Sequence, residues 1–72
     1  MLNPKIIRDL RETYPVGCRV ELVTMDDPQA PPAGTLGTVI SVDDIGTVHV
    51  LWDKGGIIGI AYGEDECRKV AN

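Results

Sequence analysis

From Gly17 onward, short runs rich in β-branched residues alternate with glycine and proline turn signals. The run Cys18–Met25 alternates apolar and charged side chains, as expected of a strand with one buried face. Pro28, Pro31 and Pro32 then interrupt any ladder, because proline has no amide donor. Further β-branched runs follow to the end of the chain, and this spacing predicts an all-β sandwich or barrel.

A helix precedes these strands. The Asn3-Pro4 pair is a helix start signal, because Asn caps free amides and Pro is suited to the first helical position. Ile6, Ile7 and Leu10 then recur at helical spacing and form a stripe that must dock on the sheet. At this chain length a five-stranded SH3-like barrel hides most sheet edges. We expect one mainly β domain over residues 1–72, with a helix at 4–13 and the β-barrel at 17–70.

Composition narrows the classes of function. The chain has 72 residues, no Phe and a net charge of -4, so the core must be largely aliphatic and sequence-independent nucleic-acid binding is disfavoured. No apolar run approaches the ~20 residues that span a bilayer, so no membrane partner is expected. Cys18 and Cys67 do not form a CxxC pattern, and two reduced thiols in a cytoplasmic protein are the favoured interpretation. A disulfide joining the first and last strands is the alternative.

Several motifs in combination are similar to a known family. They are PVGCRVEL at residues 15–22, MDDP at 25–28, PAGTLGTV at 32–39, VDDIG at 42–46 and VHVLWDKG at 48–55. Together they resemble the DUF4314 family of small bacterial domains, which also occur in phages and mobile elements. The resemblance runs from about Lys5 to Val70 and implies an SH3-like fold. The family has no agreed activity, so the resemblance implies no catalytic residue and no cofactor.

Trp52 allows two interpretations. It shares a strand face with Val48 and Val50, which favours a core position. Alternatively, a half-exposed Trp52 forms the floor of a peptide-binding groove together with Tyr14 or Tyr62.

The polar candidates favour structural roles. His49 has no second His, Cys or carboxylate at a ligand spacing, so we expect no metal site. One member of each acidic doublet, Asp26-Asp27 and Asp43-Asp44, is expected to bond turn amides. An acidic face formed by these doublets, which meets a basic partner or imitates nucleic-acid phosphate, is the alternative. Asp27 and Asp53 are further candidate binding residues beside the three aromatic ones.

Gly59 interrupts an apolar run and suggests a bend or a β-bulge there.

No nucleophile, acid–base pair or ligand set forms a catalytic constellation, so we expect no enzyme. The favoured function is a non-enzymatic module that binds a protein or peptide. The alternative is a nucleic-acid-associated accessory protein of a phage or mobile element, acting through Arg19, Arg68 and Lys69 or by acidic mimicry. A homodimer through Ile57, Ile58, Ile60 and the helix stripe is a further expectation, because that run is unusually apolar.

Overall fold

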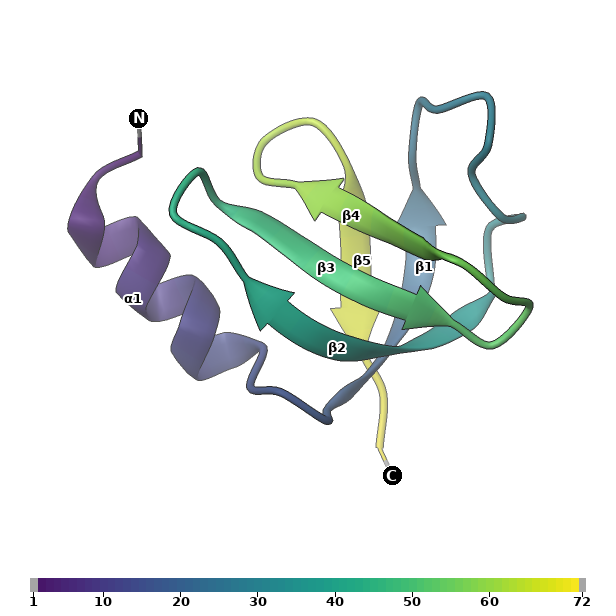
Figure 1. Ribbon diagram of the computed structural model, residues 1–72, viewed down its shortest axis with the longest axis horizontal. Coiled ribbons are helices and arrows are strands. Elements are labelled where there is room, and N and C mark those ends of the chain that lie inside the picture. The colour runs from purple at the N-terminus through teal and green to yellow at the C-terminus, as the bar shows by residue number, and fades with distance from the viewer. Residues whose placement is uncertain (1, 72) are drawn as a thin grey trace.

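The computed structural model describes residues 2–71, which form a strongly curved β-sheet with one helix beside it (Figure 1). The strands are β1 (Arg19–Thr24), β2 (Leu36–Val42), β3 (Thr47–Trp52), β4 (Ile57–Ala61) and β5 (Glu66–Lys69). Their order in the sheet is β4-β3-β2-β1-β5, and every neighbouring pair is antiparallel. This confirms the predicted mainly β fold with five strands, whose order is that of an SH3-like barrel.

Helix α1 (Pro4–Thr13) has the predicted bounds. The Asn3 side chain accepts a hydrogen bond from the Lys5 amide over 2.8 Å, which satisfies a free donor of the first turn. The helix ends where the Tyr14 amide donates to the Leu10 carbonyl. Within α1 only Ile7 is fully buried.

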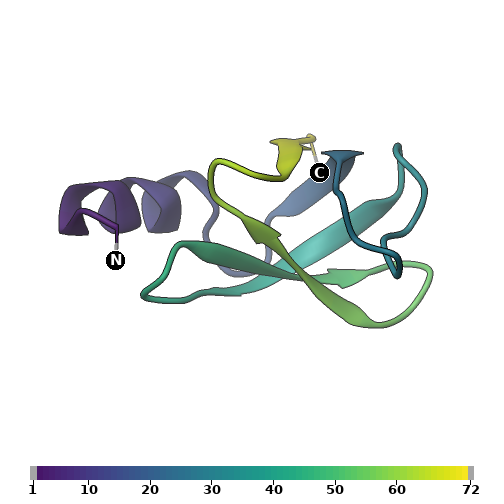
Figure 2. The same cartoon turned by 90° about the horizontal axis from the view of Figure 1, so that it is seen from above.

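The helix lies beside the β2–β3 turn, as two perpendicular views show (Figures 1 and 2). Arg11 holds it there: its guanidinium donates to the Val42 carbonyl over 3.1 Å and to the Asp44 carboxylate over 2.9 Å. An exposed ion pair by itself contributes little to the stability of the fold. The stripe residues Ile6 and Leu10 stay half-buried.

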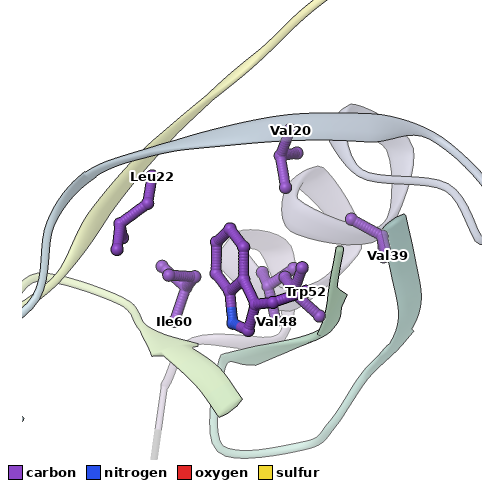
Figure 3. Packing of buried hydrophobic residues seen from close by; sticks show 7 residues of the cluster. Val20, Leu22, Val39, Val48, Trp52 and Ile60 are labelled. Atoms are coloured by element: carbon purple, nitrogen blue, oxygen red, sulfur yellow. The ribbon is translucent and has the colours of Figure 1, made fainter. Parts of the chain in front are cut away.

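The core lies on the concave side of the sheet (Figure 3). Its buried members are Val20, Leu22, Val39, Val48, Val50, Trp52 and Ile60. Trp52 is 1 % exposed, and its indole ring points into the middle of this cluster. The Trp52 Nε1–H donates to the Ile58 carbonyl over 3.1 Å, which satisfies the buried donor. This confirms the core interpretation of Trp52.

Two register shifts bend the sheet. One lies in β2 between Val39 and Ser41, and the other in β1 between Leu22 and Thr24. Gly59 pairs regularly with His49, so the bulge expected there is wrong. A Cβ at Gly59 would collide with the Thr47 side-chain methyl, and this close approach explains the glycine.

Candidate functional site

The structure brings two of the three candidate aromatic residues together. Tyr14 and Tyr62 both line a hollow between α1 and the sheet, whereas Trp52 does not. This corrects the candidate groove: a side chain that is 1 % exposed offers no surface to a peptide, so Trp52 cannot be its floor. Tyr62, 50 % exposed, stands at the surface.

The hollow encloses about 480 Å³, within the usual size range of ligand pockets. It lies where the sheet is left open, because β4 and β5 are joined by a turn and not by a ladder. We call it the helix–sheet groove. Its lining consists of Leu10, Tyr14, Thr24, Gly46, Val48, Ile60, Tyr62, Gly63, Glu64, Asp65, Glu66 and Cys67.

The groove lining combines apolar and acidic residues. Half-buried Leu10 and Tyr14 and exposed Tyr62 supply its accessible apolar surface, whereas Val48 of β3 and Ile60 of β4 belong to the buried core beneath the lining. Glu64 and Asp65, in the β4–β5 turn, supply carboxylates. A second hollow of about 290 Å³ shares Leu10, Tyr14 and Tyr62 and extends along α1 toward Ile6.

Tyr14 and Cys67 form a polar contact in the groove lining. Burial, and then the neighbouring Cys67 side chain, raises the pKa of the Tyr14 hydroxyl. Burial also raises the pKa of both thiols, Cys18 and Cys67. Each thiol is therefore protonated near neutral pH and is a poor nucleophile.

Both cysteines are free in the structure. Cys67 of β5 pairs with Leu22 of β1, four residues along the chain from Cys18. Four residues of extended chain span about 13 Å, whereas disulfide-linked Cα atoms lie within about 7 Å. The register therefore does not fit the alternative Cys18–Cys67 disulfide.

The candidate basic patch does not assemble. Arg19 forms a bidentate ion pair with Asp53, with Nη1 donating to Oδ1 over 2.8 Å. Arg68 donates to Glu21 over 2.6 Å. Lys69 follows Arg68 directly in β5, so the two side chains point to opposite faces. Arg19 and Arg68 are thus already paired with carboxylates of this chain. This pairing argues against the alternative in which Arg19, Arg68 and Lys69 together bind phosphate.

The acidic doublets bond turn amides, as predicted. Asp27 accepts from the Gln29 amide over 2.8 Å, and Asp43 accepts from the Ile45 and Thr47 amides. Asp53, the other acidic candidate, is bonded to Arg19, which holds the pKa of its carboxyl below the usual range. These carboxylates therefore have structural partners within the chain.

His49 has a partner that the sequence did not suggest. Its Nε2 lies 2.8 Å from the Asp43 carboxylate, so β3 is tied to the β2–β3 turn. The Thr47 amide and then His49 lower the pKa of Asp43. No group of three or more His, Cys, Asp or Glu side chains within residues 2–71 is placed to hold a metal ion.

The lowered pKa of Asp43 predicts a pH dependence of stability. A carboxyl whose folded-state pKa is depressed stabilises the fold above its unfolded value, and this contribution is lost as pH falls through the folded pKa. Asp43→Asn is expected to lower the urea midpoint at neutral pH, with the difference from the wild type disappearing in acid as Asp43 becomes protonated in the folded state. Urea titrations between neutral and acid pH measure this. Asp26→Asn is the control, and an equal effect of both variants at neutral pH would contradict the assignment.

Comparison with known proteins identifies the family. The model of a family described as a domain of unknown function (DUF4314) matches residues 3–70. The chain therefore belongs to the DUF4314 family, as the motifs suggested. Neither the curated proteins nor the solved structures gave a match. Over residues 2–71, no helix has the length and apolar character needed to cross a membrane.

The sequence analysis did not predict the acidic rim of the helix–sheet groove, which consists of Glu64, Asp65 and Glu66. These three residues are consecutive, so the sequence does show a local concentration of negative charge. Nothing in the local sequence indicates that apolar residues of α1 line the same groove. Of the apolar run in β4, Ile57 is 58 % exposed whereas Ile60 belongs to the core, so the run does not form one exposed patch.

Proposed function

We propose that this domain is a non-enzymatic interaction module that binds a protein or peptide segment in the helix–sheet groove. The observation that carries the proposal is a hollow of about 480 Å³ with apolar residues beside polar ones. Recognition sites usually combine an apolar interior with a few polar groups that fix orientation. Tyrosine suits such a site because it offers a large apolar ring with a polar tip.

The reactive side chains support a role without catalysis. Cys18 and Cys67 have raised pKa values, and His49 is bonded to Asp43. Raised pKa values make the two thiols poor nucleophiles, and the contact with Asp43 gives His49 a structural role.

We also propose a bacterial cytoplasmic setting, in a cell or its mobile elements. The free thiols suit a reducing compartment, and the bacterial and phage setting rests on the family resemblance.

Peptide selection followed by NMR tests the proposal. Peptides selected from a displayed random library are titrated into the ¹⁵N-labelled protein. We expect the shifted resonances to cluster on Leu10, Val48, Tyr62 and Glu64. Shifts confined to the opposite sheet face, where exposed Leu51 and Ile57 pair, would contradict the proposal, as would a selection that yields no binder.

Tyr62→Ala is expected to weaken binding of a selected peptide by at least about fivefold, because a contacting tyrosine is a common hot spot. The fold should survive, since half of this side chain is already exposed. Val16→Ala is the matched control: Val16 is 74 % exposed and lies outside the groove lining, so its variant should bind within about twofold of wild type. Fluorescence polarisation measures both affinities, and equal affinities of the two variants would count against the groove.

A further inference from the structure

We infer that the segment bound in the helix–sheet groove is cationic, with apolar side chains flanked by Lys or Arg. This inference rests on the proposed function and adds the chemistry of the partner. The apolar lining accommodates the partner's hydrophobic side chains, and the carboxylates of the β4–β5 turn select its charge.

The groove lining has one sign of charge. It contains the carboxylates of Glu64, Asp65 and Glu66, and none of its residues is Lys, Arg or His. The hollow that continues along α1 adds Asp9 and again no basic residue. In a chain with seven Lys and Arg residues, the whole lining is left without a cation.

The rim glutamates are not engaged by a basic residue of this chain. Among the described side chains, Glu64 and Glu66 have no ion pair, as is true of Glu12 and Asp26 outside the groove, whereas Glu21, Asp44 and Asp53 each pair with an arginine. Their charges are therefore free to meet a partner.

Asp65 shapes the rim instead. Its carboxylate accepts a hydrogen bond from the Ala61 amide over 3.0 Å, and its own amide donates to the Ala61 carbonyl over 2.9 Å. The backbone of the turn is thus fixed from both sides, so only the Glu64 and Glu66 side chains need to be ordered on binding.

The apolar lining increases the effect of these charges. Ion pairs beside low-dielectric surface are stronger than pairs in open water. Like charges that are brought together cost free energy, so an acidic segment or a nucleic-acid backbone would be repelled here. A basic amphipathic segment would place its apolar side chains against the apolar lining and its basic side chains beside the carboxylates.

Two short synthetic peptides test the inference: one places lysines between leucines, and the other places glutamates between the same leucines. Binding of each labelled peptide is measured by fluorescence polarisation at low and at physiological ionic strength. We expect the lysine peptide to bind at least about tenfold tighter, and its affinity to fall as salt rises.

The variant Glu64→Gln/Glu66→Gln removes the two unpaired rim charges and nearly preserves side-chain shape. It should bind the lysine peptide about threefold to tenfold more weakly, because exposed ion pairs contribute modestly. Glu12→Gln/Asp26→Asn removes the same number of charges from residues outside the groove lining and should leave the affinity within about twofold. Circular dichroism confirms that both variants are folded.

The outcomes separate the two claims. Tighter binding of the lysine peptide, lost in the rim variant alone, supports the inference. Tighter binding of the glutamate peptide in the groove overturns the cationic partner and leaves the proposed function standing. Equal loss in both double variants overturns the inference, because bulk charge would then explain the effect. If neither peptide binds and library selection also fails, the proposed function falls with it.

Discussion

Trp52→Ala is expected to remove a large fraction of the stability of the domain at room temperature. Truncating a buried Trp costs about 3–5 kcal/mol, and a chain of this length has only about 4–11 kcal/mol in total. Trp52 is the largest fully buried side chain, and Figure 3 shows its ring between Leu22, Val39 and Ile60.

Thermal unfolding by circular dichroism measures this loss. At about 4–8 °C per kcal/mol for a domain of this size, the midpoint should fall by at least about 12 °C. Trp52→Phe is the matched control: it keeps an aromatic ring but loses the bond to the Ile58 carbonyl, so its loss should be clearly smaller. In the wild type, Trp52 emission should be blue-shifted and poorly quenched by acrylamide. A red-shifted, readily quenched emission would place the indole in water and contradict this account.

The elements could be predicted from the sequence because their causes are local. Asn3 and the Ile6–Leu10 spacing determine where α1 begins and which stripe it carries. Alternation placed Trp52 on the face of Val48 and Val50, and the structure confirms that face as the core. Cap chemistry and side-chain period act over a few residues, so a single sequence reveals them.

The groove could not be predicted, because it depends on where distant elements meet. Tyr14 at the end of α1 and Tyr62 after β4 come together only when the sheet curves back past the helix. The two bulges that bend the sheet lie at Val39/Ser41 and Leu22/Thr24, and neither site carries a glycine as a local signal. The glycine that suggested a bulge, Gly59, instead leaves room for the Thr47 side chain.

The ion pairs of the arginines could not be predicted either, because they too join residues that are distant in the sequence. Arg19 and Asp53 are 34 residues apart in sequence, and Arg68 and Glu21 are 47 apart. The number of basic residues in the sequence therefore does not show how many are already paired with carboxylates. Glu64 and Glu66 remain without an arginine partner among the described side chains.

Gly37→Ala is expected to destabilise the domain by about 1–3 kcal/mol, the usual cost of overfilling a packed core. A Cβ at this position would lie 2.5 Å from Val50 Cγ1 and 2.8 Å from Trp52 Cε3. Gly37 also pairs with Val20 on one side and Trp52 on the other, so a backbone shift would disturb two ladders. Ser41→Ala, at an exposed position of the same strand, is the control and should change little. Urea unfolding at neutral pH measures both, and an equal midpoint for the two would contradict the argument.

A double variant distinguishes this collision from a general intolerance of alanine in β2. Val50→Ala removes the methyl that meets the new Cβ but leaves a cavity, so by itself it is destabilising. In Gly37→Ala/Val50→Ala the added methyl occupies part of that cavity. The double variant should therefore be less destabilised than the sum of the two single changes, since residues in contact are not additive. Strict additivity would mean that the collision with Val50 Cγ1 does not contribute to the cost of Gly37→Ala.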